Sequence, residues 1–301
     1  MPSIRRLLLL LITTASMATG AFADERRSMI PLSLNEGDYD GGRIYAPVRF
    51  GNVAGTMRLD TGASTSRITL ALWNKDFPVV GHTGSMGASG KVMRCDDVEA
   101  RNVLLKAAQG DSIGRAKYTL SRCPSSDGDD LLGLDFFRGT RFLLDLAHRE
   151  IVFPDQKTPG ADQAHSFVAL GAERRLVGVN VRIGDVATTG LFDSGAEISA
   201  VDLSFVKSHG NLFTPVKSHI KASEAGGGRW APKLFRLKEI DLGEGQSLKG
   251  IYVLGYDFGV LREALGAQTS VILGYNFLSR FQWDLDFTTP DAPKWSARLR
   301  H

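Results

Sequence analysis

The chain has 301 residues, of which 43% are hydrophobic and 23% are charged, a composition typical of globular proteins and unlike that of disordered ones. Its length allows one large domain or two domains of ordinary size. The formal net charge is only +3, from 36 basic and 33 acidic residues, so the charge gives no reason to expect a nucleic acid or an anionic membrane as partner.

The first 23 residues have the pattern of a secretory signal peptide. A basic start with Arg5 and Arg6 precedes the apolar stretch LLLLLITTASMATG, and Ala21-Phe22-Ala23 forms a small-x-small cleavage site. The apolar segment is marginal in length for crossing a bilayer. We therefore expect cleavage of residues 1–23, export to the periplasm or the medium, and no stable membrane insertion afterwards. An uncleaved membrane anchor is the alternative.

Residues 28–34, SMIPLSL, predict an entry strand to the mature chain. Farther along, Cys95 and Cys123 are the two cysteines of the sequence. In an exported protein such a pair predicts one disulfide, and two free thiols are the alternative. The six histidines are scattered, and neither Cys-x-x-Cys nor His-Glu-x-x-His occurs. We therefore expect no metal and no other cofactor.

The sequence contains an internal repeat. Residues 48–63 read VRFGNVAGTMRLDTGA and residues 181–196 read VRIGDVATTGLFDSGA, with nine of sixteen positions identical at a constant offset of 133. Each copy predicts a β-hairpin with a Gly-Asn or Gly-Asp turn and an aspartate at its exit, Asp60 in the first and Asp193 in the second. A repeat of this length predicts two related units in one chain.

A second landmark repeats downstream of each aspartate. Leu131-Leu132-Gly133 and Ile272-Leu273-Gly274 follow the two aspartates by 73 and 81 residues, with a Gly-rich segment in between in both copies. The Pro-, Gly- and polar-rich stretch 154–165 predicts a linker. The expected organisation is therefore an N-terminal lobe at 24–153, the linker at 154–165, and a C-terminal lobe at 166–301.

These repeated motifs resemble those of the aspartic proteases. The resemblance is carried by Asp60-Thr61-Gly62-Ala63, Asp193-Ser194-Gly195-Ala196 and the two Leu-Gly landmarks, and it covers nearly the whole mature chain. Alanine after each glycine, and Gly-rich loops without a tyrosine, resemble the retropepsin-like type. Two half-sites fused in one chain are the pepsin arrangement. The resemblance implies an all-β, bilobal acid protease fold: two related β-barrel lobes with short helices, an active site between them, and a plausible monomer.

The resemblance also implies an aspartic endopeptidase that acts on peptide or protein substrates. Asp60 and Asp193 would share one proton and activate a water molecule, which favours activity at acidic to mildly acidic pH. Thr61, Gly62, Ser194 and Gly195 would support this pair, the hydroxyls by hydrogen bonds across the lobe interface. The alternative is a peptide-binding protein of the same fold with weak or no catalysis.

The remaining candidates concern substrate contacts. Ala63 and Ala196 would line the substrate site, and Gly87 and Gly227 would lie in flaps that close over it. Glu197 would contact the substrate backbone or an arginine, unless it is simply a solvated surface charge.

Arg58 departs from the resembled pattern, which has an apolar residue there, as Leu191 is in the second copy. Strand alternation places Arg58 on the same face as Asp60. We expect Arg58 to favour acidic or polar substrate side chains in one subsite or to pair with Glu197, and its charge could impair the shared-proton pair. A surface position on a partly exposed strand is the alternative.

Overall fold

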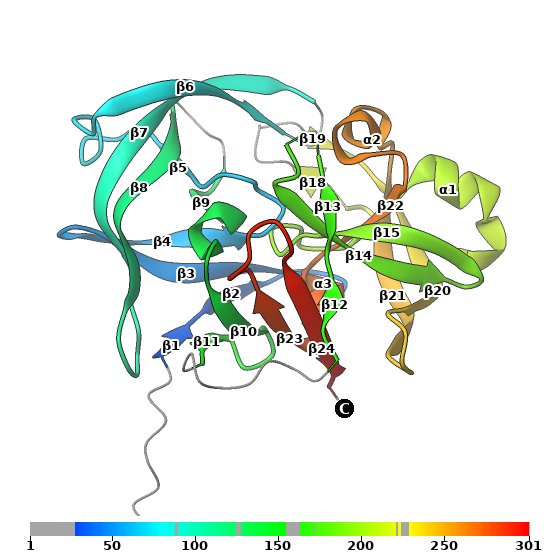
Figure 1. The fold of residues 1–301 in the computed structure, drawn as a ribbon. Helices are drawn as coiled ribbons and strands as arrows, with labels where there is room; N and C mark the ends of the chain where they lie inside the picture. Colours follow the sequence, from blue (N-terminus) through cyan, green and yellow to red (C-terminus); the bar gives the residue numbers. More distant parts are fainter. Residues whose placement is uncertain are drawn as a thin grey trace, which may run out of the picture.

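The computed structural model describes residues 28–300 except 88–89, 125–127, 155–162, 172, 221 and 224–228. The chain is all-β, with two lobes and a few short helices (Figure 1), which confirms the predicted fold class. The expected signal peptide, 1–23, and most of the expected linker, 154–165, lie outside the described residues.

The N-terminal lobe is built on an eight-stranded sheet that closes into a barrel, because β7 pairs back onto β3. The strand order is β2 (Ser33–Glu36), β3 (Gly42–Phe50), β4 (Val53–Asp60), β9 (Leu131–Gly133), β5 (Arg67–Thr69), β8 (Ile113–Cys123), β7 (Val92–Leu105) and β6 (Val79–Met86). One 3-10 helix, η1 (Leu134–Phe137), follows β9.

The C-terminal lobe repeats this arrangement, and β14 pairs with β20 to close its barrel. The strand order is β13 (Val168–Leu170), β14 (Leu176–Ile183), β15 (Val186–Phe192), β22 (Thr269–Leu273), β16 (Ala200–Asp202), β21 (Ser247–Tyr256), β20 (Lys233–Asp241) and β17 (Phe213–Val216). Its helices are α1 (Leu203–Ser208), η2 (Gly210–Leu212), α2 (Gly259–Leu265) and α3 (Tyr275–Leu278), and β18 (Ala222–Ser223) pairs with β19 (Arg229–Trp230).

The two predicted hairpins are confirmed as β3–β4 and β14–β15. Their turns begin at Gly51 and Gly184, which have φ values of 55° and 58°, a left-handed conformation that glycine adopts without the steric penalty of a Cβ. The repeat in sequence is therefore a repeat in structure, strand for strand.

A third sheet joins the lobes, and the sequence did not predict it. Its order is β1 (Ser28–Pro31), β11 (Glu150–Phe153), β10 (Arg141–Asp145), β23 (Phe281–Asp286), β24 (Lys294–Leu299) and β12 (His165–Ser166). The pairing of β10 with β23 connects the two halves of the chain. The single predicted entry strand is in fact two strands, because the chain leaves this sheet after Pro31, whose nitrogen cannot donate a ladder hydrogen bond.

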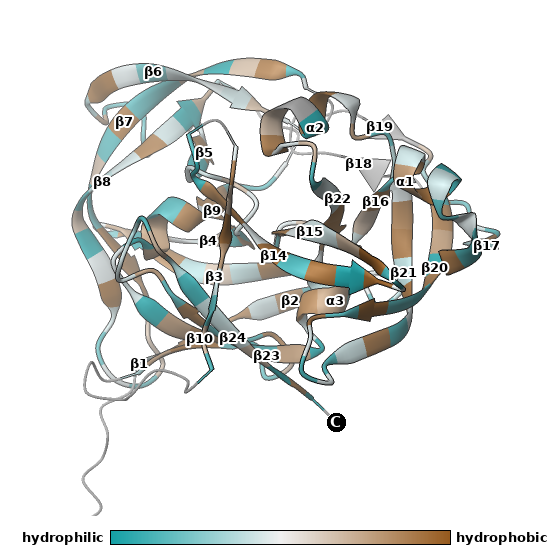
Figure 2. Cartoon of the chain, turned by 45° about the vertical axis from the view of Figure 1, so that its right-hand side comes forward, coloured by the Kyte–Doolittle hydropathy of each residue, from teal (hydrophilic) through white to brown (hydrophobic). Residues whose placement is uncertain are grey.

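Side chains alternate between the core and the solvent along most strands. Figure 2 shows this as alternating hydrophobic and hydrophilic bands along β20 and β21. Trp283 of the joining sheet is fully buried, and its ring lies 4.8 Å from that of Phe192, the residue before Asp193. The hydrophobic core therefore connects the joining sheet to the strand that ends at the second aspartate.

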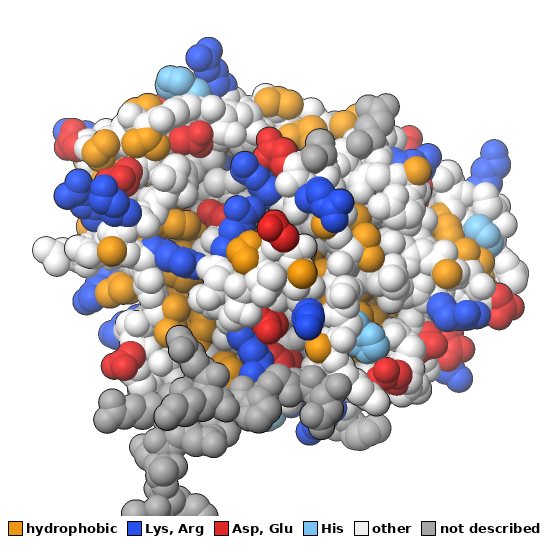
Figure 3. Space-filling model, in the orientation of Figure 1, with side chains coloured by type: hydrophobic (Ala, Val, Ile, Leu, Met, Phe, Trp, Pro, Cys, Tyr) orange, Lys and Arg blue, Asp and Glu red, His pale blue; other side chains and the backbone are white. Residues whose placement is uncertain are grey.

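Charges of both signs are interspersed over the face drawn in Figure 3, in keeping with the small net charge. Within the described part of the chain, every helix is too short or too polar to cross a bilayer.

Candidate active site

The two repeated aspartates lie at the ends of equivalent strands. Asp60 is the last residue of β4 and is in register with Gly133 of the parallel strand β9. Asp193 follows β15, and its backbone N–H donates to the carbonyl of Leu273 in the parallel strand β22, at 3.1 Å. In both lobes the Leu-Gly landmark is thus the strand that holds the aspartate in place.

Each aspartate packs against the glycine of the other lobe. A Cβ placed on Gly62 would lie 2.4 Å from the carboxyl carbon of Asp193, and a Cβ on Gly195 would lie 2.4 Å from that of Asp60. Any side chain at either position would overlap a carboxyl group. The glycines of both motifs therefore allow the carboxyl groups of the two lobes to meet.

Four buried hydrogen bonds join the two aspartate-containing loops. The Thr61 hydroxyl donates to the Phe192 carbonyl at 2.9 Å and accepts from the Ser194 N–H at 2.9 Å. The Ser194 hydroxyl donates to the Leu59 carbonyl at 3.0 Å and accepts from the Thr61 N–H at 3.1 Å. Both hydroxyls bond across the lobe interface in a symmetric pattern that fixes the two loops relative to each other.

A second layer of polar contacts supports each loop. In the first lobe the Ser66 hydroxyl accepts from the Gly133 N–H at 2.8 Å and donates to Asp135 at 3.0 Å. Ser199, Gly274 and Asn276 repeat this arrangement in the second lobe. Sequence reasoning missed Asp135 and Asn276, although each is the second residue after its Leu-Gly landmark. Comparing the two landmarks position by position would have found them.

The two alanines that were expected to line the substrate site also make backbone hydrogen bonds. The Ala63 carbonyl accepts from the Leu134 N–H at 2.9 Å, and the Ala196 carbonyl accepts from the Tyr275 N–H at 2.7 Å. These bonds tie the two loops to η1 and α3. Contact of either alanine with a substrate stays a prediction.

The two carboxyl groups are electrostatically unequal. Burial raises the pKa of Asp60, while the positive charge of Arg58 and a hydrogen bond from Asp193 oppose the rise. Burial and the negative charge of Asp60 raise the pKa of Asp193 to about 8. Because close like charges cannot both ionise easily, the pair retains one proton well above the ordinary range of an aspartic acid.

Arg58 is next to this pair and is not a surface residue, since its side chain is only 16% exposed. Its Nη2 donates to the Gly195 carbonyl at 2.5 Å and lies 3.9 Å from a carboxylate oxygen of Glu197. Glu197 also forms an ion pair with Arg43, from β3 of the other lobe. Sequence reasoning missed Arg43, which stands where the second repeat has Leu176.

The hairpin of β6 and β7, which contains Gly87 and is called the flap below, extends across the top of Figure 1 towards α2. Closure of this hairpin over a substrate stays a prediction, with a plain surface turn as the alternative. Gly87 lies at its tip, where its N–H donates to the Lys91 carbonyl at 3.0 Å. Gly90 lies between Gly87 and the start of β7, and a Cβ placed on it would lie 2.6 Å from a methyl carbon of Val260 in α2. The flap of the first lobe therefore touches the second lobe. Gly227, the other expected flap residue, lies outside the described residues.

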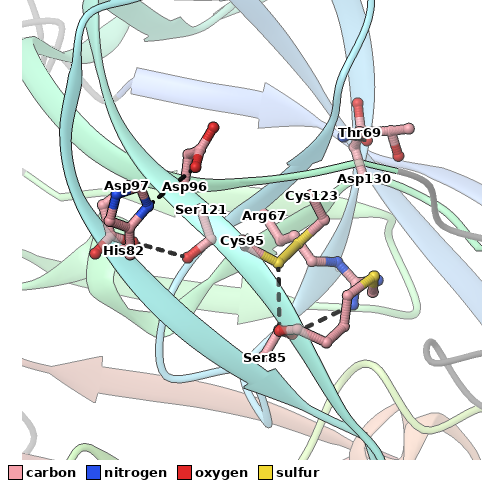
Figure 4. Close-up of a disulfide and its surroundings, with 11 residues drawn as sticks. Arg67, Thr69, His82, Ser85, Cys95, Asp96, Asp97, Ser121, Cys123 and Asp130 are labelled. Carbon is pink, nitrogen blue, oxygen red and sulfur yellow. Dashed lines mark hydrogen bonds and ion pairs between the residues drawn. A yellow bond between two sulfur atoms is a disulfide. The ribbon is translucent and has the colours of Figure 1, made fainter.

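The predicted disulfide is confirmed: Cys95 of β7 is bonded to Cys123 of β8, with the Cα atoms 4.4 Å apart. Figure 4 shows the disulfide near Arg67 of β5 and Ser85 of the flap strand β6, whose hydroxyl is 3.5 Å from the Arg67 guanidinium. Both cysteines are buried, at 1% and 0% exposed. The bond thus joins a flap strand to the body of the barrel.

Replacing both cysteines by alanine is expected to lower the free energy of unfolding by about 3 kcal/mol, because the closed loop restricts the unfolded chain. Urea unfolding of the double variant, compared with the oxidised and the reduced parent protein, measures this difference. An oxidised parent no more stable than its reduced form would contradict a stabilising role.

The comparisons with known proteins agree with this geometry. Residues 179–277, about a third of the chain, match the aspartyl protease family model. No curated protein matches the sequence. Among solved structures, the aspartic proteinase from Irpex lacteus has a TM-score of 0.52 at 14% identity, covering 90% of this chain and 97% of that one.

Two basic 7S globulins have similar structures. The basic 7S globulin from soybean has a TM-score of 0.53 at 11% identity, covering 90% of this chain and 95% of that one. Conglutin gamma from lupine seeds has a TM-score of 0.54 at 10% identity, covering 92% and 95%. At such low identity these likenesses establish the fold alone. Part of the second lobe is therefore similar to the aspartyl protease family, and the two lobes together have the fold of an aspartic proteinase.

Proposed function

We propose that this protein is an aspartic endopeptidase that hydrolyses peptide bonds with a water molecule activated by Asp60 and Asp193. One observation carries the proposal: each carboxyl group packs against the glycine of the other lobe, at an interface closed by the hydrogen bonds of Thr61 and Ser194. Two carboxyl groups that share one proton supply a general base and a general acid together.

The electrostatics favour a definite assignment of the first step. Arg58 stabilises the ionised form of Asp60, so Asp60 would act as the base, while Asp193 would carry the proton. Asp60 removes a proton from water as the water oxygen attacks the carbonyl carbon. Asp193 gives its proton to the carbonyl oxygen, which yields a neutral tetrahedral diol.

The second step returns the protons. Asp60 transfers the proton it gained to the leaving nitrogen as the carbon–nitrogen bond breaks. Asp193 takes back a proton from a hydroxyl of the diol as the new carboxylic acid forms. The pair ends with one proton, as it began, so the cycle is balanced without a metal or a covalent intermediate.

The raised pKa of Asp193 bears on the pH range. The one-proton form that this mechanism needs would persist to about pH 8. The expected activity therefore reaches neutral pH, which is higher than the acidic to mildly acidic range that the motifs alone suggested.

The direct test is incubation of the purified chain, from residue 24 onward, with a peptide library between about pH 4 and pH 8, the range over which the pair titrates. Mass spectrometry identifies new termini. We expect cleavage at internal peptide bonds and inhibition by pepstatin. If the folded protein cleaves nothing but binds peptides, the alternative of a peptide-binding protein with this fold replaces the proposal.

Export to the periplasm or the medium is part of the proposal. The buried disulfide supports it, because such bonds persist in oxidising compartments. The substrates would then be peptides or proteins outside the cytoplasm, and one chain would suffice for the site because it contains both aspartates.

A further inference from the structure

Arg58 breaks the symmetry of the site. The equivalent position in the second lobe is Leu191, which is 4% exposed and packs in an apolar cluster with Phe258 and Ile272. The two aspartates therefore lie between unlike walls: a guanidinium on the side of the first lobe and closely packed hydrocarbon on the side of the second.

The contacts of Arg58 cross the lobe boundary. Its strand, β4, belongs to the first lobe, but the one hydrogen bond that its side chain makes among the described residues is to the carbonyl of Gly195, two residues after Asp193. Its Nε is buried without a hydrogen-bond partner in that same part of the chain. The first lobe thus has a guanidinium with incomplete hydrogen bonding at the position where the second lobe has a buried leucine.

Several other charged groups surround Arg58. The Asp129 and Glu197 carboxylates lie 3.8 and 3.9 Å from it, too far for hydrogen bonds. The Tyr45 hydroxyl donates to Asp129 at 3.0 Å, and Arg43 forms an ion pair with Glu197. The guanidinium of Arg58 therefore lies between these two carboxylates and donates its hydrogen bond to the second active-site loop.

Arg67, from β5, is a second cation whose charge acts on Asp60, and it lies in the field of Asp130 as well. Its counterpart in the other lobe is Ala200. Both of these arginines thus come from the first lobe, and Arg58 also contacts the loop of Asp193.

We propose that Arg58 is a positioning residue of the aspartate pair: it holds the second active-site loop through the Gly195 carbonyl and keeps one of the two carboxyl groups ionised. This inference rests on the proposed function. A guanidinium is charged at every pH at which proteins are folded, so its effect is a constant bias towards ionisation of the aspartates. Its charge lowers the pKa of both aspartates, in opposition to burial.

The test compares three variants at Arg58 with the parent. Arg58→Leu installs the residue of the second lobe, Arg58→Gln is a polar neutral substitute, and Arg58→Lys keeps the charge without the planar fork. Arg280→Leu is the matched control, because Arg280 forms an ion pair with Asp40 in which both side chains are exposed. The readout is kcat/KM against pH, from about pH 3 to pH 9, for a peptide that the parent cleaves.

We expect both apparent pKa values of the profile to rise by about one unit or more in Arg58→Leu and Arg58→Gln. Arg58→Lys should keep both apparent pKa values near those of the parent while kcat falls about tenfold through loss of the contact with Gly195. Arg280→Leu should leave the profile unchanged. Unchanged pKa values in both neutral variants would overturn the inference. So would a change confined to the KM of peptides with acidic side chains, because that would make Arg58 a specificity residue instead.

A second readout does not need activity. The free energy of unfolding depends on pH wherever the folded aspartates hold a proton that the unfolded chain releases. The upper end of that pH window should move up by the same amount in the neutral variants, and not in Arg58→Lys or Arg280→Leu. If no variant cleaves any peptide, a moved window still supports the action of Arg58 on the pair, while an unmoved window refutes it. The proposed function can therefore fail without deciding this inference.

Discussion

Replacing Asp193 by asparagine is expected to reduce peptide hydrolysis by at least about 1,000-fold, and Asp60→Asn should do the same, because an amide can neither share the proton nor exchange it with water. The double variant should lose little more than either single variant, since the two groups act as a unit. Single-turnover cleavage of one library-derived peptide measures all three. Cleavage that survives either substitution at more than a tenth of the parent rate would contradict the assignment of this pair.

The same substitution should change how stability depends on pH. An unfolded aspartate ionises near pH 3.9, whereas burial and the charge of Asp60 raise the pKa of folded Asp193 to about 8. Between these values the folded state holds a proton that the unfolded state has released. The contribution of Asp193 to the free energy of unfolding therefore falls as pH rises, by up to about 1.4 kcal/mol per pH unit, and it is fully present only below about pH 4.

Asp193→Asn removes this titrating group, so its stability should fall less steeply between about pH 4 and pH 8. The free energy of unfolding of the variant should therefore increase relative to that of the parent as pH rises. Urea unfolding at several pH values, in a common ionic strength, measures the difference between the two curves. Parallel curves for parent and variant would mean that Asp193 is ionised in the folded protein at mildly acidic pH.

Substituting alanine for Gly62 should have the second large effect. The new Cβ would lie 2.4 Å from the carboxyl carbon of Asp193, so that side chain or the loop itself must move. Displacement of about 1 Å at a reacting group can lower the rate about 100-fold, and forced overpacking typically costs about 1–3 kcal/mol of stability. Gly195→Ala should behave alike, because it meets Asp60 at the same distance.

Gly55→Ala is the matched control. Gly55 lies in the same strand as Asp60, and a Cβ there would meet no atom within 4 Å. Gly55→Ala should leave kcat unchanged when it is measured with the same peptide, in parallel with Gly62→Ala. If Gly62→Ala kept the parent kcat and stability, the carboxyl group of Asp193 could not lie against Gly62.

The fold was predictable because it is repeated in the sequence. The ungapped match between the two Asp-Gly segments identified two equivalent hairpins, and each Leu-Gly landmark proved to be the parallel partner of its aspartate strand or of the residues leading into it. The sheet that joins the lobes was not predictable in the same way. It pairs β10 with β23, and the central pair, Leu143 and Asp284, is 141 residues apart in the sequence. No repeat or motif in these two segments indicates that they pair or in which register.

The site was predictable in its repeated residues and less so in its unrepeated ones. The repeat identified Asp60, Thr61 and Gly62 as site residues, because the second lobe has an equivalent residue at each position. Arg43 and Asp129 have no charged copy, so nothing in the sequence singled them out. Only the pairing of strands brings Arg43 to Glu197 and Asp129 to Arg58.

The sequence by itself determined that two aspartates of one chain occupy equivalent loops, since local motifs and their spacing are written directly in the residues. The tertiary structure alone decided how those aspartates differ: which charges act on each of them, that Arg58 and Arg67 both come from the first lobe, and where the flap touches the second lobe. Electrostatic interaction depends on distance through space and on burial, and neither quantity follows from separation along the chain.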